Sequence, residues 1–189
     1  MQRSLKLPEW VPKLREKLRS GGEAPAPIIG ASQADRIANA IYQFTGDPPR
    51  LDALAGQCLG VHWSFQKCIG NIVGVDPVLT VGGVEQDAGH SPFKFSREQF
   101  DDWSNNGVQQ LFNLKIHAWL TLPSLEIIDL TFVASLFAAK GAKTWPYPQH
   151  EPFFAQSWQN FKGITYKPVA AGADILDKLH LLQFFVSGA

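Results

Sequence analysis

One stretch of the chain, residues 115–131, constrains the fold more than any other. It reads KIHAWLTLPSLEIIDLT, and apolar side chains alternate with other residues as far as Pro123. This period of two is typical of a strand with one buried face. Just beyond Pro123-Ser124, a second β-rich run covers residues 127–131. Two strands joined by so short a connection form a hairpin, so the sequence predicts a β-hairpin here.

The register of this hairpin decides whether the side chains of His117 and Asp129 can meet. A change of one residue in the loop moves every side chain of one strand to the other face of the sheet. A loop over residues 122–124 would pair Thr121 with Leu125 and place His117 opposite Asp129 on one face. We expect this loop, or a bulge with the same effect. The alternative is that both residues are polar edge positions that point into water.

The composition is that of one globular domain. The chain has 189 residues, of which 45% are hydrophobic and 12% aromatic. Lys plus Arg and Asp plus Glu both number 17, so no net charge draws the protein onto nucleic acid or an anionic membrane. The N-terminus lacks the apolar segment of a signal peptide, and no run approaches the roughly 18 apolar residues of a membrane span. We therefore expect a cytoplasmic protein that neither crosses a membrane nor binds nucleic acid.

Residues 1–30 are expected to form an N-terminal helical arm and linker, followed by one domain over residues 31–189. In the arm, Trp10, Leu14 and Leu18 recur at every fourth position among lysines and arginines, which predicts a short amphipathic helix over residues 8–19. The Gly and Pro residues between positions 21 and 27 indicate a linker. A solvated charged face is the commoner case, and contact with a partner through residues 8–19 is the alternative.

Another helical pattern begins at Cys58. The row Cys58, Val61, Phe65, Cys68 and Ile72 steps by three or four residues, so Cys58 opens a helix on the side that faces the core. Cys68, in the middle of the row, is interpreted as a small buried side chain. The two cysteines would lie about 15 Å apart on one helix, beyond the reach of a disulfide. We expect both to be free thiols.

The remaining elements follow from capping, periodicity and turn signals. The sequence predicts helices near residues 32–44, 96–103 and 133–141, strands over 78–84 and 164–169, and an amphipathic segment over 174–185. Apart from residues 84–115, the connections around the hairpin are shorter than the dozen or so residues that a parallel crossover needs. We expect an α+β domain whose Cys58 helix packs against an antiparallel sheet containing residues 78–84, 116–122 and 127–131.

Three polar residues of this arrangement suit acyl-transfer chemistry. The start of a helix lowers the pKa of a cysteine, because free backbone N–H groups and the helix dipole favour the thiolate, and Cys58 occupies such a start. His117 can accept and return the proton, and Asp129 can fix the tautomer of the imidazole. The N–H groups at the helix start can hold an oxyanion, and Gln57 can add a side-chain donor.

Taken together, these residues resemble the transglutaminase-like branch of the papain-like cysteine protease fold. The resemblance rests on a Cys at the head of a helix, the run GVDPVLTVGG that follows it, HAW on one strand and the Asp of IIDLT on the next. It covers about residues 56–132. The family order is Cys, His, Asp, which implies Cys58 as nucleophile, His117 as base and Asp129 as orienting acid. Trp119 stands where the family usually has an aromatic residue.

The chain departs from the family pattern in one place. The family often has an acidic or polar residue soon after His-Ala-Trp, whereas this chain has Leu120-Thr121-Leu122, and Pro123 shortens the hairpin. The substrate class therefore stays open, because family members include peptidases, transglutaminases, amidases and inactive binding domains.

The polar residues also suit two other roles. His62, one turn after Cys58, is an alternative base, but side chains four residues apart on one helix seldom reach across a bound acyl group. It is expected to line the cleft with Trp63. A zinc site formed by Cys58, His62, His117 and Asp129 has suitable ligand types but no compact Cys/His spacing. We expect no metal and no cofactor.

Two function hypotheses follow from the sequence. The first is an enzyme that uses a Cys-His-Asp triad for acyl transfer or for hydrolysis of a peptide, protein or small amide substrate. The second is a catalytically inactive interaction domain of the same fold. All three positions of the triad carry competent residues, which favours the enzyme.

Overall fold

The computed structural model describes residues 26–46, 50–86, 93–108, 114–143, 154–157, 163–172 and 174–181. The arm helix expected at residues 8–19 lies outside these residues, as do residues 182–185 of the expected C-terminal amphipathic segment. Both stay predictions.

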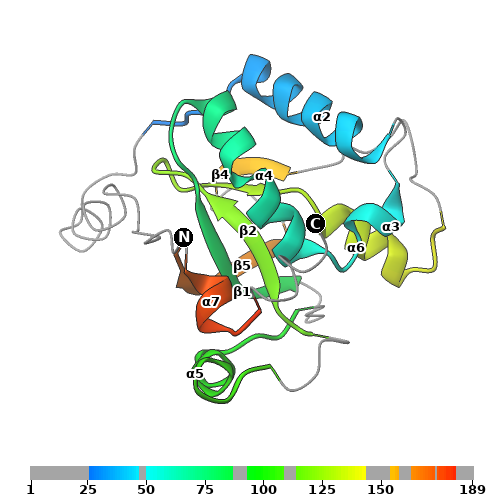
Figure 1. Cartoon of the computed structure of the whole chain (residues 1–189). Helices are drawn as coiled ribbons and strands as arrows, with labels where there is room; N and C mark the ends of the chain where they lie inside the picture. The colour runs from blue at the N-terminus through cyan, green and yellow to red at the C-terminus, as the bar shows by residue number, and fades with distance from the viewer. Residues whose placement is uncertain are drawn as a thin grey trace.

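The architecture is a single antiparallel sheet packed with helices (Figure 1). Five strands are described in the order β4-β3-β2-β1-β5, and every neighbouring pair is antiparallel. Their bounds are β1 Val78–Gln86, β2 His117–Thr121, β3 Glu126–Asp129, β4 Phe154–Ser157 and β5 Ile164–Ala171. The expected α+β class, with an antiparallel sheet that contains the hairpin, is confirmed.

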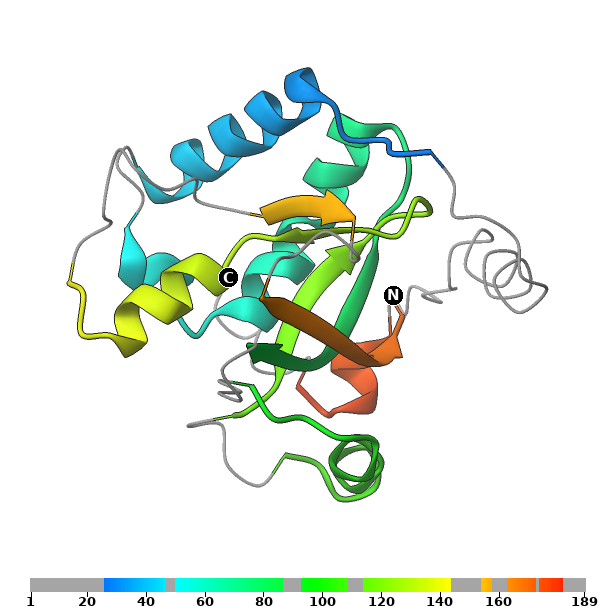
Figure 2. The ribbon, with the colours of Figure 1, turned by 180° about the vertical axis from the view of Figure 1, so that it is seen from behind.

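The described helices are α2 Ala31–Thr45, α3 Leu51–Leu54, α4 Cys58–Val73, α5 Arg97–Asn106, α6 Phe132–Ala139 and α7 Ile175–Lys178. Helix α4 lies against the sheet at β2 and β1, and α2 lies above α4 in both views (Figures 1 and 2). The short helix α3 lies beside α6 in both views. Within the described residues, no helix has the length and apolar character that crossing a bilayer requires.

Helix α4 begins at Cys58 as expected, but the second half of its buried row differs from the prediction. Cys68 is exposed, and the buried positions of α4 that follow Phe65 are Ile69, Gly70 and Val73. After Phe65 the buried row continues in steps of four, so the larger Ile69 enters the core one position beyond Cys68. The interpretation of Cys68 as a buried side chain is wrong. Both cysteines are free thiols, as expected.

The predicted hairpin is present, with a register two residues away from the expected one. Thr121 pairs with Ile127 and not with Leu125. A shift of two residues preserves the face on which each side chain lies. His117 and Asp129 therefore share a face as expected, although they are not directly opposite.

The hydrogen bonds of the turn explain why the loop between β2 and β3 is longer than the expected loop over residues 122–124. The N–H of Leu122 donates to the carbonyl oxygen of Glu126 at 3.0 Å, and Leu125 takes a left-handed conformation with φ of 65°. A second bond runs from the N–H of Leu125 to the carbonyl oxygen of Leu122 at 2.9 Å. Pro123 has no N–H for a ladder, so strand pairing begins only outside the turn.

Strand β1 continues through its glycines to Gln86, beyond the predicted end at Val84. Gly82 pairs with His117 on one side, while the register with β5 shifts between Val81 and Gly82 on the other. A Cβ atom at Gly82 would lie 2.0 Å from the carbonyl oxygen of Lys167 and 2.9 Å from the ring of Trp119. Glycine at this position thus lets β5 and the Trp119 ring approach β1 beside His117.

A buried carboxylate joins the start of the described chain to the sheet. Glu126, 3% exposed, accepts hydrogen bonds from the backbone N–H groups of Ile28 at 2.6 Å and Ile29 at 3.1 Å. The Ser124 hydroxyl also donates to it, at 2.5 Å. Both isoleucines pack against the main core. Residues 28–29 are therefore fastened to β3 by polar and apolar contacts.

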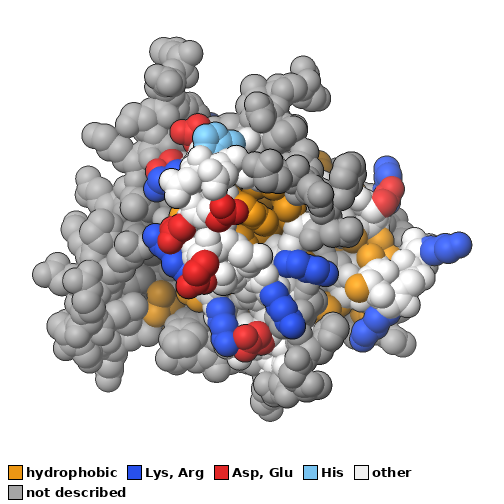
Figure 3. Space-filling view, turned by 90° about the horizontal axis from the view of Figure 1, so that it is seen from below, with side chains coloured by type: hydrophobic (Ala, Val, Ile, Leu, Met, Phe, Trp, Pro, Cys, Tyr) orange, Lys and Arg blue, Asp and Glu red, His pale blue; other side chains and the backbone are white. Residues whose placement is uncertain are grey.

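Charges of both signs lie next to one another on the face of the molecule that carries α5 (Figure 3). Lys167 pairs with Glu85 at 2.6 Å, and Arg97 pairs with Asp101 at 3.1 Å. Pairs that are this exposed contribute little to stability.

Candidate active site

The start of α4 is held by its two neighbouring helices. Gly56, with φ of 73°, donates its N–H to the Ser135 hydroxyl of α6 at 3.2 Å. The N–H of Gln57 donates to the carbonyl oxygen of Leu54 in α3 at 3.1 Å. Cys58 is the first residue of the helix, where backbone N–H groups have no intrahelical acceptor. The thiol is thus carried on a braced helix N-terminus.

His117 and Asp129 lie at the same end of two neighbouring strands. His117 is the first residue of β2, and Asp129 is the last residue of β3. His117 Nε2 lies 2.5 Å from Asp129 Oδ2, and both side chains are fully buried. The structure therefore brings together the two residues that the hairpin register was expected to bring together.

The Asp129 carboxylate is held from several sides. Its Oδ1 accepts from the backbone N–H groups of Thr131 at 3.0 Å and Phe132 at 2.9 Å. Its Oδ2 accepts from the Tyr166 hydroxyl at 2.7 Å, in addition to His117. Phe132 begins α6, so the positive end of a helix dipole also faces the carboxylate.

Asp129 and His117 form a buried ion pair. Burial alone would raise the pKa of Asp129, but the charge and hydrogen bond of His117, together with the Thr131 N–H, hold that pKa well below its usual range. Burial alone would lower the pKa of His117, but the charge and hydrogen bond of Asp129, with a smaller contribution from Cys58, raise it to about 10. The imidazole is thus held in its protonated form near neutral pH.

The second ring nitrogen of His117 is not used by Asp129, and His117 lies close to Cys58. His117 Nδ1 is buried and has no hydrogen-bond partner in the described part of the chain. Cys58 is close enough to His117 to contribute to the raised pKa of the imidazole. In this structure the Cys58 sulfur lies 3.8 Å from the carbonyl oxygen of Ile116, to which the thiol is a weak donor. The three candidate residues therefore form one contiguous group.

His62 is placed differently from the expectation that it lines a cleft. It is fully buried, with Nδ1 2.6 Å from the carbonyl oxygen of Cys58 and Nε2 accepting the N–H of Leu130 at 2.8 Å. Burial and the charge of His117 outweigh the attraction to Asp129 and lower the pKa of His62 to about 4. With Nδ1–H donating and Nε2 accepting, both ring nitrogens are used. His62 is a neutral bridge between α4 and the end of β3, which leaves it no nitrogen for the role of a base.

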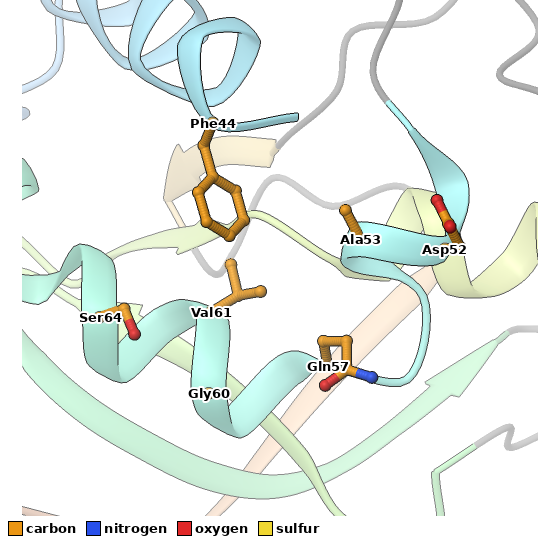
Figure 4. Close-up of a pocket in the computed structure, with 7 residues that line it drawn as sticks. All are labelled: Phe44, Asp52, Ala53, Gln57, Gly60, Val61 and Ser64. Carbon is orange, nitrogen blue, oxygen red and sulfur yellow. The ribbon is translucent and has the colours of Figure 1, made fainter. Parts of the chain in front are cut away.

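The other residues expected at the cleft, Trp63, Trp119 and Gln57, lie in three different surroundings. Trp63 is half-buried against the main core. Trp119 is buried, and its ring meets Tyr166 edge to face with centroids 5.0 Å apart. Gln57 is exposed, and its side chain lies beside a hollow of about 280 Å³. Figure 4 shows this hollow between Phe44 of α2, α3 and the first two turns of α4.

Aromatic rings enclose His117. Phe93 stacks on the imidazole with centroids 4.4 Å apart, and Phe132 meets it edge to face at 5.7 Å. Cys58 is only 6% exposed. The candidate site is therefore closed in this structure, and a substrate needs some movement of its cover to reach the thiol.

Sequence reasoning missed two of these neighbours, Tyr166 and Phe93. The strand that carries Tyr166 was predicted, and a buried tyrosine hydroxyl usually needs a partner. This rule could have indicated that the Tyr166 hydroxyl forms a hydrogen bond, but it could not have identified Asp129 as the acceptor. Phe93 carried no comparable signal.

The described residues contain no group of three or more His, Cys, Asp or Glu side chains that could hold a metal ion. His62 and Asp129, two of the ligands considered for zinc, already use their polar atoms in hydrogen bonds.

Comparison of the chain with protein-family models, with curated proteins and with solved structures finds no match. The resemblance to the transglutaminase-like family rests on the residues alone.

Proposed function

We propose that this chain is a cysteine-dependent enzyme of transglutaminase-like fold that transfers acyl groups or hydrolyses amides or peptides. Cys58 is the nucleophile, His117 the base and Asp129 the orienting acid. The substrate is a peptide, protein or small amide, and water or an amine is the acceptor. No metal or cofactor takes part in the steps below.

The reaction divides into two halves. The Cys58 thiolate forms a bond to the carbonyl carbon, and the π electron pair moves onto the oxygen. When this intermediate collapses, the C–N bond breaks and the amine leaves with the proton of His117 Nδ1. Water or a second amine then attacks the thioester, His117 takes up its proton, and the C–S bond breaks to restore the thiolate.

One observation carries the proposal. His117 gives Nε2 to Asp129 and keeps Nδ1 buried without a partner among the described residues, and it lies close enough to Cys58 for that residue to affect its pKa. A buried polar atom without a partner is costly and calls for an explanation. The proposed explanation is that His117 Nδ1 exchanges a proton with Cys58. The free N–H groups at the start of α4 are further support, since they suit the oxyanion of the intermediate.

The second candidate function is a catalytically inactive interaction domain of the same fold. The closed surroundings of the site favour it, because Cys58 is 6% exposed and Phe93 stacks on His117. In this case the ion pair of His117 and Asp129 serves the stability of the domain alone.

Acylation with p-nitrophenyl acetate separates the two functions. The chain has only two cysteines, so mass spectrometry of peptides can compare buried Cys58 with exposed Cys68 in one sample. The enzyme proposal predicts faster acetylation at Cys58 despite its burial, and loss of that advantage in His117→Ala. Acetylation of Cys68 alone would instead support the inactive domain.

A further inference from the structure

Tyr166 reaches the candidate site from a distant part of the sequence. It lies on β5, pairs with Val84 of β1 and is 6% exposed. The Trp119 ring meets it edge to face. Its hydroxyl donates to Asp129 Oδ2 at 2.7 Å. Burial and the negative charge of Asp129 raise the pKa of Tyr166 well above its usual value, so the hydroxyl keeps its proton and stays a donor.

The two oxygens of Asp129 have different partners. Oδ1 is fastened to the start of α6 by two backbone N–H groups, those of Thr131 and Phe132. Oδ2 is shared between His117 Nε2 and the Tyr166 hydroxyl. Because the backbone bonds already orient the carboxylate, the Tyr166 hydroxyl is not required for that purpose. The hydrogen bond of Tyr166 therefore acts on Oδ2, the oxygen that accepts the hydrogen bond of the His117 imidazole.

When a carboxylate oxygen accepts a hydrogen bond from a second donor, its bond to the first donor becomes weaker. Hydrogen bonds to an ionised group are strong, and each donor withdraws part of the negative charge. The Tyr166 hydroxyl thus weakens the hold of Oδ2 on the imidazolium of His117. An imidazolium that is held too strongly is a poor acid, and the proposed reaction requires it to protonate the leaving amine.

We propose that Tyr166 is a positioning residue that, by sharing Asp129 Oδ2 with His117, keeps the imidazolium able to release its proton to the leaving amine. This inference rests on the proposed acyl-transfer function. It assigns Tyr166 a part in cleaving substrates with poor leaving groups, such as amides. Substrates whose leaving group needs no proton, such as p-nitrophenyl esters, are unaffected by it.

The test uses Tyr166→Phe, which removes only the hydroxyl, and Tyr42→Phe on α2 as a matched control. The ¹H signal of His117 Nε2–H reports the bond to Oδ2 without any need for activity. We expect it to move downfield in Tyr166→Phe and to stay in place in Tyr42→Phe. Replacement of Tyr166 by 3-fluorotyrosine, a stronger donor that keeps the ring, should move it upfield.

The catalytic arm compares p-nitroacetanilide with p-nitrophenyl acetate, which carry the same acyl group. In Tyr166→Phe, kcat for the anilide should fall about tenfold or more relative to that for the ester, the size expected for one hydrogen bond to a charged group, while KM stays unchanged. An unchanged Nε2–H signal in both Tyr166 variants would overturn the inference, as would equal losses on anilide and ester. If the signal moves but the wild-type chain cleaves neither probe, the proposed function fails while the sharing of Oδ2 stands.

Discussion

His117 and Asp129 are bonded across the hairpin although they are out of register by two residues. The pairing of Leu120 with Ile128 brings Asp129 level with Trp119, yet Asp129 Oδ2 lies 2.5 Å from His117 Nε2. The diagonal contact is possible because cross-strand neighbours two residues apart remain within reach of long side chains. The backbone bonds of Asp129 to the start of α6 then hold its carboxylate at the end of the strand, beside the imidazole.

The two cysteines should respond oppositely to substitution. Cys58→Ala should abolish acylation and turnover of p-nitrophenyl acetate, because it removes the proposed nucleophile. Cys68→Ala should retain both activities, and its free energy of unfolding should stay within about 0.5 kcal/mol of wild type, since Cys68 is exposed. Denaturant titrations and initial rates measure the two effects. Full turnover in Cys58→Ala would rule out Cys58 as the nucleophile.

Asp129→Asn should slow the reaction by a factor on the order of 10⁴, the size seen when the orienting acid of a triad is replaced. The neutral amide no longer favours the imidazolium or the tautomer that places a proton on Nε2. The rate of acetyl transfer at saturating substrate is the measurement. Asp101→Asn, at an exposed side chain of α5, is the matched control and should leave the rate unchanged. Similar losses in both variants would point to a general effect of charge.

Stability should reach a maximum near pH 6.5, the ordinary pKa of histidine. Between about pH 4 and 6.5, unfolding lets buried His62 take up a proton, because its folded pKa is lowered to about 4, so stability falls with acid. Above pH 6.5, unfolding releases a proton from His117, because its folded pKa is raised to about 10, so stability falls with alkali. Each slope is at most about 1.4 kcal/mol per pH unit.

Urea titrations of His62→Gln test the acid limb of this curve. The variant should lose the dependence between pH 4 and 6.5 and keep the alkaline limb. Exposed His180→Gln should keep both limbs. If His62→Gln still loses stability between pH 6.5 and 4, groups other than His62 cause that loss. Asp129 is not expected to be one of them, because its lowered pKa reduces stability only below about pH 4.

Truncation at two points should separate the arm from the domain. Deletion of residues 1–20 should leave the melting temperature nearly unchanged, because the Gly and Pro residues between positions 21 and 27 indicate a linker that separates the arm from the domain. Deletion of residues 1–30 removes Ile28 and Ile29, leaves the buried Glu126 carboxylate without their N–H groups and should cost about 2–4 kcal/mol. Thermal melts of the two truncated proteins give the comparison. An equal loss in the shorter deletion would place part of the arm in the core.

Local pattern was sufficient for much of the fold. Alternation in residues 115–131 located β2 and β3, and their short connection made them antiparallel. The helical row from Cys58 located the start of α4. These features depend on neighbours within a few residues, so the sequence alone determines them. The same parity argument placed His117 and Asp129 on one face.

Contacts between distant segments decided the rest. Whether Cys68 or Ile69 enters the core depends on how α4 meets the sheet, and both choices continue a helical row. His62 became a bridge because Leu130, 68 residues away, offers its N–H. Tyr166 reaches Asp129 only because β5 joins the sheet at β1. Periodicity describes which side of an element is buried, whereas the partner on that side is set by packing across the whole chain, which no local pattern encodes.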